Sequence, residues 1–553
     1  MMIKGSEAIV KLLEEQGVDT VFGYPGGAVI PLFDALYNSK LNRVLTAHEQ
    51  GAIHAADGYA RASGNVGVCI ATSGPGATNI VTGLATAYLD SIPVVAITGQ
   101  VGVNMLGRDS FQEIDITGVT LSITKYNMLI RKKEDLIPGL RKAFRVAKEG
   151  RPGPVLVDVP SSIQNELLEY PELNAKARAT TNVAREDYLA EIAEAINNAE
   201  RPVLMVGGGA INSGAQAELI ELAEKADIPV ASSLMGLGAF PGSNKLSLGL
   251  SGMHGHIAAN MAVSTADVLV VIGSRFSDRV TGDRNSYHGE KTIIQFEIDI
   301  SEVDKNVEVD YSLVGDAKEN LQKLLPLIKE AKHEMWWNQV LAWRATETRA
   351  LTHVDRLTAP NVMEIMNNEF EGKDPIYVTD VGQNQMWAAQ YLKIDKPRHF
   401  LTSGGCGTMG FGLPGALGAS FVAGEHPVVS ISGDGGFKMT GMELYTACRE
   451  NQKLISVVIN NSCLGMVRQW QHLFYDKRYS STILTDFDFI GFAKSCGADG
   501  VRVTTCEEFK EALKQAQASD KTFVIEAIVE QGDMVDPMVA AGARINDFVD
   551  TFK

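Results

Sequence analysis

The fold is decided by the stretch Val428-Val429-Ser430-Ile431-Ser432-Gly433-Asp434-Gly435-Gly436, an apolar strand that runs into a glycine-rich turn. A second apolar run, Ile455–Ile459, ends in Asn460-Asn461, and the 24 residues 436–459 separate the two turns. Open parallel sheets bind ligands at the carboxyl ends of their strands, so both turns should border one crevice. The sequence therefore predicts a ligand site at one edge of a parallel sheet.

The side chains of these two turns suit a divalent cation and a phosphate group. Asp434 and Asn461 offer the hard oxygen ligands that Mg²⁺ prefers. Gly435 and Gly436 let the backbone approach phosphate oxygens, and the N–H groups of the following helix can point at them. Either turn alone is more simply a strand-to-helix turn with a capping Asp or a turn Asn. Together, at this spacing, they resemble the diphosphate-binding signature of thiamine diphosphate enzymes.

Strand-like runs alternate with helical stretches along the whole chain, which is the pattern of parallel sheets covered by helices on both faces. We predict an α/β protein of three consecutive doubly wound, mostly parallel-sheet domains, over residues 1–165, 186–345 and 360–553. The first and third domains could share one architecture. The predicted strands are Arg43–Ala47, Gly67–Thr72, Pro93–Thr98, Val155–Val159, Pro202–Val206, Val268–Ile272, Ile293–Ile298, Ile376–Thr379, Val428–Ser432, Ile455–Ile459 and Thr522–Ile528.

Other segments are predicted to be helical or to connect the domains. Residues 1–17 read as an amphipathic helix, and Ser73–Ala87 reads as one continuous helix. The polar segment 165–186 has no clear period and reads as a linker. The charged stretch 320–348 reads as helical and separates the second domain from the third.

The composition restricts the partners. A net charge of −17 argues against nucleic acid or an anionic membrane, because phosphate backbones are bound by clustered Lys and Arg. The six cysteines include no C-x-x-C pair, so we expect reduced thiols rather than a disulfide framework. No apolar run reaches membrane-spanning length, and the first residues lack the features of a signal peptide. We expect a cytoplasmic protein that acts on small molecules.

Glu49, in Ala47-His48-Glu49-Gln50-Gly51, follows another apolar strand. A Glu in the first turn of a helix is commonly only a favourable partner of the helix dipole. A zinc site of the H-E-x-x-H type is excluded because position 52 is Ala. In a thiamine diphosphate enzyme, a carboxylate bonded to the aminopyrimidine ring helps the cofactor to lose its reactive proton. We therefore predict Glu49 as the catalytic carboxylate.

With Glu49 and the two turns in view, nearly the whole chain resembles the catalytic subunit of acetohydroxyacid synthase (acetolactate synthase). The resemblance implies a homodimer or homotetramer with active sites at the subunit interface, where Glu49 and Asp434 of one site come from different chains. It leaves open a separate regulatory small subunit. The motifs that carry it are Tyr24–Ala28, Ser73–Asn79, Phe111–Glu113, Arg151–Val155 and Gly404–Pro414.

The resemblance implies three sets of residues around the substrates and thiamine diphosphate. Met409 would hold the cofactor bent, although a Met between glycines could equally fill the core. Asn384 stands where many relatives carry His. The thiamine diphosphate set is Gly26, Pro75, Gln383, Asn384, Met409, Gly435 and Gly436; the metal set is Asp434, Asn461 and Cys463; the substrate set is Gly27, Phe111, Gln112, Met466 and Trp470.

The middle domain resembles the FAD-binding domain of the biosynthetic enzymes, in which the flavin undergoes no net redox change. Ser277 stands where relatives usually carry Asp. As bare patterns, three glycines and two arginines could be an ordinary turn and surface charges. The implied flavin set is Arg151, Gly207, Gly208, Gly209, Met253, His254, Gly273, Arg275, Arg279, Val280, Glu297, Ile298 and Asp316.

The implied activity is acetolactate synthase: decarboxylation of pyruvate and transfer of the hydroxyethyl unit to pyruvate or 2-oxobutanoate, the first common step in branched-chain amino acid biosynthesis. Its cofactors would be thiamine diphosphate, Mg²⁺ and FAD. Three alternatives remain: a fermentative acetolactate synthase, a pyruvate oxidase-like enzyme that passes electrons to FAD, and a non-catalytic scaffold on the same fold.

Overall fold

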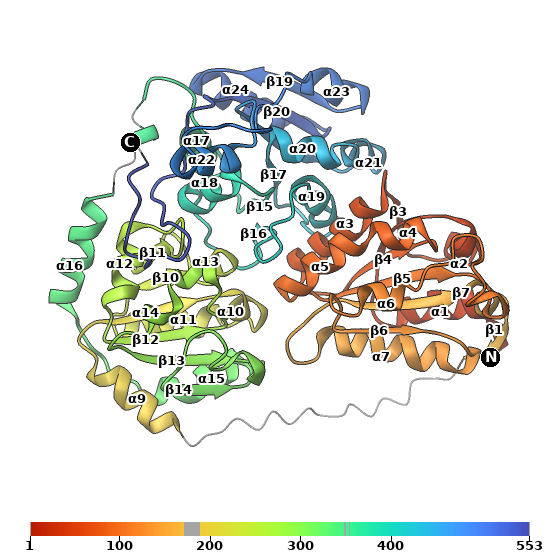
Figure 1. Ribbon diagram of the computed structural model, residues 1–553, viewed down its shortest axis with the longest axis horizontal. Helices are drawn as coiled ribbons and strands as arrows, with labels where there is room; N and C mark the ends of the chain where they lie inside the picture. Colours follow the sequence, from red (N-terminus) through yellow and green to blue (C-terminus); the bar gives the residue numbers. More distant parts are fainter. Residues whose placement is uncertain (1, 171–187, 348–349, 353, 552–553) are drawn as a thin grey trace.

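The computed structural model describes residues 2–170, 188–347, 350–352 and 354–551. Three α/β domains, each built on a six-stranded parallel sheet, lie around a common centre (Figure 1). Helices cover both faces of each sheet, which confirms the predicted fold class. The predicted linker 165–186 falls mostly outside the described residues.

The N-terminal sheet has the strand order β3-β2-β4-β5-β7-β6. Its central strands are buried along their whole length, as expected for apolar runs covered by helices on both faces. The strands are β2 (Thr20–Tyr24), β3 (Asn42–Leu45), β4 (Gly67–Ala71), β5 (Val94–Gln100), β6 (Tyr126–Leu129) and β7 (Val155–Pro160). The helices are α1 (Gly5–Glu15), α2 (Ile30–Tyr37), α3 (Glu49–Ser63), α4 (Pro75–Asn79), α5 (Val81–Asp90), α6 (Ile116–Thr120), α7 (Leu136–Lys148) and α8 (Ser161–Asn165).

Two predictions for this domain are wrong in detail. The first helix is preceded by a strand, β1 (Met2–Lys4), which pairs antiparallel with β8 (Leu167–Glu169). The predicted helix Ser73–Ala87 is two helices, because α4 ends at Asn79 and α5 begins at Val81. This break turns the end of α4, and Asn79 with it, toward the start of α3, where its side chain bonds to Glu49.

The middle domain has the strand order β11-β10-β9-β12-β13-β14, which is the order of a dinucleotide-binding sheet. Its strands are β9 (Pro202–Val206), β10 (Val230–Ser232), β11 (Ser247–Leu250), β12 (Val268–Ile272), β13 (Thr292–Glu297) and β14 (Tyr311–Val314). Its helices are α9 (Leu189–Asn198), α10 (Gly208–Asn212), α11 (Gln216–Lys225), α12 (Ile257–Thr265), α13 (Asp278–Thr281), α14 (Arg284–Tyr287) and α15 (Ala317–Leu324), followed by α16 (Glu334–Ala345).

The C-terminal sheet has the order β16-β15-β17-β18-β20-β19, which repeats the connectivity of the N-terminal sheet strand for strand. The two domains therefore share one topology. The strands are β15 (Ile376–Thr379), β16 (Phe400–Leu401), β17 (Val428–Gly433), β18 (Leu454–Asn460), β19 (Asp499–Val503) and β20 (Phe523–Ile528). The helices are α17 (Ala359–Glu369), α18 (Gln383–Tyr391), α19 (Gly412–Ser420), α20 (Asp434–Thr440), α21 (Glu443–Arg449), α22 (Gly465–Phe474), α23 (Phe489–Ser495) and α24 (Cys506–Ala518).

The N- and C-terminal domains meet through α3 and α19, which lie side by side (Figure 1). Glycines allow this close approach, because a Cβ on Gly58 would overlap the backbone of Gly415, and a Cβ on Gly418 would overlap the carbonyl of Ala55. Alanines and apolar residues from both helices form one continuous core across the boundary. The two domains are therefore packed as one body rather than joined only by the chain.

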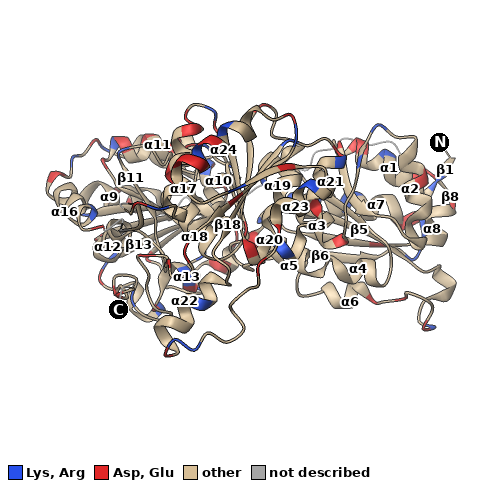
Figure 2. Ribbon diagram, turned by 90° about the horizontal axis from the view of Figure 1, so that it is seen from above, with Lys and Arg blue, Asp and Glu red and all other residues tan. Residues whose placement is uncertain are grey.

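The C-terminal tail, residues 529–551 after β20, extends from its own domain and packs on the middle domain. The Val539 amide donates to the Met253 carbonyl at 2.8 Å, and the Asn260 side chain donates to the Ile545 carbonyl at 2.8 Å. Acidic and basic residues are interspersed over the elements of all three domains (Figure 2). Within the described ranges, no helix is long and apolar enough to span a membrane.

Candidate active site

The two turns of the C-terminal sheet meet in one small cavity, here called the cradle. Strands β17 and β18 are neighbours, and their register pairs Gly433 with Ile459, so Asp434 and Asn461 emerge side by side. The cavity of about 50 Å³ is lined by both turns and by Gln383, Asn384, Met409, Cys463 and Met466. Every described residue that lines it comes from the C-terminal domain.

Asp434 is a buried carboxylate, and no cationic side chain among the described residues forms an ion pair with it. Burial raises the pKa of Asp434 to about 6, and the charge of Lys438 opposes that rise. A buried carboxylate of this kind favours a bound cation, which would remove the cost of its desolvation. The position and the electrostatics therefore fit a metal ligand.

Asn461 is oriented by its neighbours. Its Nδ2 donates to Oε1 of Gln383 at 3.0 Å, and its Oδ1 accepts from the Cys463 amide at 3.3 Å. Gln383 in turn donates to Oε1 of Gln469 at 2.9 Å and to the Asp533 carbonyl at 2.9 Å. The amide oxygen of Asn461 is thus held at the cradle by a chain of hydrogen bonds that reaches α22 and the C-terminal tail.

Asn384, the predicted neighbour of the diphosphate, also lies in the cradle. Its Nδ2 donates weakly to the Val381 carbonyl at 3.4 Å, and its Oδ1 is buried without a protein partner. A buried polar atom without a partner normally meets a ligand or an ordered water. The side-chain amide of Asn384 is therefore available to a bound group.

Met409 borders the cradle, and Asp380 fixes two glycines that follow it. The carboxylate of Asp380 accepts from the Gly410 amide at 3.0 Å and from the Gly412 amide at 3.0 Å. Burial raises the pKa of Asp380 to about 6, and these backbone bonds lower it. The methyl of Met409 lies 3.6 Å from the place that a Cβ of Gly435 would take. The Met side chain and the glycine turn therefore face each other across the cradle.

Glu49 lies away from the cradle, at the carboxyl edge of the N-terminal sheet. It is the first residue of α3, and Asn79 donates to its Oε2 at 3.0 Å. Its Oε1 lies 3.3 Å from the place that a Cβ of Gly76 would take, so the glycine keeps the space beside it open. The carboxylate is half-buried and is not part of the cradle of its own chain.

The other predicted residues of this domain surround the same edge. Pro75 begins α4, and Gly26 lies against Thr72, whose hydroxyl accepts from the Ala28 amide at 3.3 Å. Gly27 faces open space. Gln112 has a positive φ of 59° and packs against Gly74, while Phe111 is 86% exposed. Neither Phe111 nor Gln112 lines the cradle, although Met466, another predicted substrate residue, does.

A second and larger cavity, about 650 Å³, lies where the three domains meet and is here called the interdomain pocket. Gly207, one of the predicted flavin residues, does not line this pocket. It packs on the backbone of Gly273, which does line it. Met466, Trp470, Asp90, Gly404 and Gly405 also line the pocket. The predicted flavin residues that line it are Arg151, Gly208, Gly209, Met253, His254, Gly273, Arg275, Arg279, Val280, Glu297, Ile298 and Asp316.

Charged groups converge on this pocket. Arg151 Nη1 donates to Glu302 at 2.8 Å, and Arg275 Nη2 donates to the Leu89 carbonyl at 2.6 Å. Burial, helped by the charge of Arg151, lowers the pKa of Arg275. Burial raises the pKa of Glu297, although the amides of Asp299 and Ile298 donate to it. A pocket with partly buried guanidinium groups and a glycine turn suits an anionic, partly apolar ligand.

Comparison with known proteins places the chain. The N-terminal, central and C-terminal domains of thiamine pyrophosphate enzymes match residues 3–119, 189–324 and 380–527. The probable acetolactate synthase large subunit of Methanocaldococcus jannaschii is 45% identical over 563 residues, covering 99% of this chain and 95% of the relative. The acetolactate synthase large subunit of Corynebacterium glutamicum is 45% identical over 560 residues, covering 98% and 89%. The acetolactate synthase isozyme 3 large subunit of Escherichia coli is 40% identical over 565 residues, covering 99% of this chain and 98% of the relative.

The chain belongs to the acetolactate synthase large-subunit family. The resemblance drawn from Glu49 and the two turns is therefore confirmed. Its first and last domains are thiamine diphosphate-binding domains. The shared topology of those two domains matches their shared family description.

Three residues of this acetolactate synthase were missed from sequence. Asp380 directly follows a predicted strand, which is the signal that also marks Asp434. Glu443 is on a helix and accepts from the amides of Ala47 and His48, both at 3.1 Å, so a C-terminal carboxylate supports the turn before Glu49. Asp90 ends α5 and bonds to the C-terminal domain. The last two contacts join residues hundreds of positions apart, and no local pattern marks them.

Proposed function

We propose that this chain decarboxylates pyruvate and transfers the two-carbon unit to a second 2-keto acid, giving 2-acetolactate from pyruvate and 2-aceto-2-hydroxybutanoate from 2-oxobutanoate. The observation that carries the proposal is the meeting of Asp434 and Asn461 in one buried cradle in a member of this family. Thiamine diphosphate, when bound, supplies the carbon that attacks the keto group and takes up the electrons released with CO₂.

The cradle residues would hold Mg²⁺, which would neutralise the charge of a bound diphosphate. Asp434 supplies a carboxylate and Asn461 an oriented amide oxygen, and we assign the third protein ligand to Cys463, whose position follows Asn461 by two residues. In the described part of the chain, no group of three His, Cys, Asp or Glu side chains could hold a metal alone. This favours an ion that takes further oxygens from a bound diphosphate.

Glu49 would act on the pyrimidine ring of the cofactor. Asn79 holds Oε2, so the other carboxylate oxygen is left to bond to a ring nitrogen and to stabilise its protonated form. Gly26 and Pro75 lie at the same sheet edge and would contact the ring. Met409 and the glycine turn would limit the room for the thiazolium, which supports a bent cofactor.

A homodimer or homotetramer would bring Glu49 of one chain to the cradle of another. In the single chain, Glu49 is outside the cradle and Phe111 is almost fully exposed, which is unusual for a large aromatic residue. A partner would bury Phe111 and place it beside Met466 and Trp470, where it would line the pocket of the second keto acid with Gly27 and Gln112. Other exposed apolar residues support such a contact, namely Leu121, Met439 and Met442.

FAD would occupy the interdomain pocket. The volume, the glycine turn at Gly208 and Gly209, and the cations Arg151 and Arg275 fit a dinucleotide. Ser277 also lines the pocket, so the replacement of the usual Asp leaves a hydroxyl at the site. Relatives are described as large subunits, which supports a separate small subunit. A cytoplasmic location stays a prediction.

Product analysis tests the proposal. The purified chain with Mg²⁺ and thiamine diphosphate is given pyruvate, with and without 2-oxobutanoate and FAD. We expect acetolactate, detected as acetoin after acidification, and a mixed product when 2-oxobutanoate is present. Bleaching of the flavin in step with anaerobic pyruvate consumption would instead establish the pyruvate oxidase. Acetolactate formation that does not depend on FAD would favour a fermentative acetolactate synthase. Failure of the chain to bind thiamine diphosphate would favour a non-catalytic scaffold on the same fold.

A further inference from the structure

The loop 402–411, which joins β16 to α19, borders both cavities of the molecule. Its first part, residues 402–407 and here called the first half, lines the interdomain pocket through Gly404, Gly405 and Gly407. Its second half carries Met409 into the cradle. Only a few residues therefore separate the part of the loop at the interdomain pocket from the part at the cradle.

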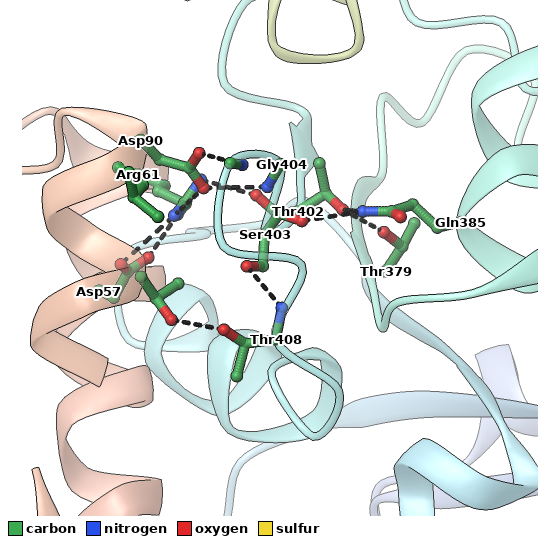
Figure 3. A network of polar contacts seen from close by, with 12 residues as sticks. Asp57, Arg61, Asp90, Thr379, Gln385, Thr402, Ser403, Gly404 and Thr408 are labelled. Carbon is green, nitrogen blue, oxygen red and sulfur yellow. Dashed lines mark hydrogen bonds and ion pairs between the residues drawn. The ribbon is translucent and has the colours of Figure 1, made fainter. Parts of the chain in front are cut away.

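The N-terminal domain holds the first half of this loop through Asp90 (Figure 3). Its Oδ2 accepts from the Gly404 amide at 3.0 Å and its Oδ1 accepts from the Gly405 amide at 2.7 Å. Arg61 Nη1 donates to the Thr402 carbonyl at 2.7 Å. Both oxygens of one carboxylate are thus committed to consecutive backbone amides of another domain.

Arg61 keeps Asp90 in place. Its guanidinium is buried and pairs with Asp57, and its Nη2 lies 2.9 Å from Oδ2 of Asp90 (Figure 3). Burial alone would lower the pKa of Arg61, but the two carboxylates raise it above its ordinary value. Removing one partner from such a buried group leaves an uncompensated charge, which is strongly unfavourable. The Asp90 side chain is therefore held in one rotamer by Arg61 and by the two backbone amides.

The two halves of the loop are tied to each other. The Thr408 amide donates to Oγ of Ser403 at 3.0 Å (Figure 3). The Thr408 hydroxyl bonds at 2.7 Å to the hydroxyl of Thr86, which precedes Asp90 by four residues on α5. Beyond Met409, the Gly410 amide is held by Asp380. A displacement of Gly404 and Gly405 is therefore passed through the Ser403–Thr408 bond to the residue before Met409.

The residues that hold the loop 402–411 also form part of the wall of the interdomain pocket. Asp90 itself lines the pocket, and Arg275 donates to the carbonyl of the preceding residue, Leu89, at 2.6 Å. A ligand that bonds to Arg275, or that contacts Asp90 in the pocket, can therefore change the positions of Leu89 and Asp90. The physical connection runs from Arg275 through Asp90 and the loop to Met409.

We propose that Asp90, held by Arg61, is a positioning residue that couples the filling of the interdomain pocket to the affinity of the cradle. The inference rests on the proposed binding of FAD and thiamine diphosphate. It gives the flavin a role that needs no electron transfer, because the bound flavin holds the loop in the form that accepts the second cofactor. Coupling between two sites is reciprocal, so thiamine diphosphate also strengthens flavin binding.

The test is calorimetric titration of thiamine diphosphate with Mg²⁺ into the full-length, flavin-free chain, with and without saturating FAD. For the unaltered chain we expect FAD to lower the Kd by about 5-fold or more. In Asp90→Asn, which keeps the shape but loses the ion pair and one acceptor, the ratio of the two Kd values should fall to about 1. Flavin fluorescence titrated with thiamine diphosphate measures the reciprocal effect without any activity assay.

Two further variants separate coupling from folding. Thr408→Val removes the hydroxyl bond to Thr86 with little change in volume, and it should also reduce the ratio. Asp158→Asn removes another buried carboxylate of the same domain, bonded to Thr98 and Gln100 and not to the loop, and it should keep the ratio of the unaltered chain. If Asp90→Asn fails to fold, Thr408→Val decides.

The outcomes are distinct. An unchanged ratio in the folded Asp90→Asn or Thr408→Val variant, or no effect of FAD on the unaltered chain, overturns the inference and leaves the proposed function intact. No binding of thiamine diphosphate by the unaltered chain overturns the proposed function itself. The inference is also overturned if Asp158→Asn reduces the ratio of the two Kd values as much as Asp90→Asn does. The loss of coupling would then follow from removing any buried carboxylate and not from the contacts of Asp90.

Discussion

The side-chain amide of Asn79 donates a hydrogen bond of 3.0 Å to Oε2 of Glu49. Asn79 ends α4 and Glu49 begins α3, so the bond joins the end of one helix to the start of another. The bond fixes the carboxylate while leaving its second oxygen beside Gly76, which has no side chain to cover it. Glu49 is thus oriented before any ligand arrives.

Replacing Glu49 by Gln tests its chemical role. Gln keeps the size and can still accept from Asn79, so the melting temperature should stay near that of the unaltered chain. Without a carboxylate to favour the protonated ring, acetolactate formation should fall by about 10²- to 10⁴-fold. Steady-state assay with saturating cofactors measures the loss, and near-normal output would remove Glu49 from the mechanism.

Gly436→Ala tests the cradle. A Cβ there would overlap the carboxylate of Asp380, which holds Gly410 and Gly412 on either side of Phe411. Overpacking of this kind costs about 1–3 kcal/mol, so thiamine diphosphate binding should weaken by about tenfold or more. Gly532→Ala is the matched control, because a Cβ at Gly532 meets nothing within 4 Å. Equal affinities of the two variants in calorimetry would contradict the assignment of the cradle.

Gly209→Ala tests the interdomain pocket. A Cβ there would lie 2.6 Å from the Cα of Gly273, so the two glycine turns would be forced apart. We expect the purified variant to carry little flavin, measured by absorbance after release. Gly214→Ala, at φ +66° with nothing within 4 Å, should lose about 1–2 kcal/mol of stability but retain flavin. A fully loaded Gly209→Ala protein would place the flavin elsewhere.

Asp158 should make stability depend on pH. Burial raises its pKa to about 7, although Thr98 and Gln100 donate to it. Between about pH 4 and about pH 7 the folded state holds a proton that the unfolded state has lost, so rising pH removes up to about 4 kcal/mol of stability. The stability of the unaltered chain relative to Asp158→Asn should therefore decrease from about pH 5 to about pH 8 in denaturant titrations. A relative stability that rises with pH would show that the folded state favours the charged carboxylate.

The sequence predicted the elements whose signals are local. Long apolar strands such as Val428–Ser432 and the polar residues directly after them are marked by their neighbours, so the cradle was predicted from the spacing of Asp434 and Asn461. Short edge strands carry little signal: β16 has two residues and β1 has three, and neither was predicted. The break at Ile80 was missed because neither Ile80 nor its two neighbours, Asn79 and Val81, is a glycine or proline that would mark the end of a helix.

Contacts between distant parts of the chain could not be predicted. Asp90 and Gly404 are 314 positions apart, and Glu443 lies 395 positions from His48. An Asp at the end of a helix or a Glu at its start usually caps a helix or faces water. Only the folded arrangement of α3, α5 and α19 shows that these carboxylates support the loop beside Met409 and the turn before Glu49.

The most direct test of the account is complementation between two inactive variants. Glu49→Gln and Asp434→Ala chains are expressed separately and together in equal amounts, and acetolactate formation is measured in the purified proteins. If one active site takes Glu49 from one chain and Asp434 from its partner, half of the randomly formed dimers are mixed and each contains one intact site, so about a quarter of the normal activity returns. Mixed proteins no more active than either variant alone would contradict the account.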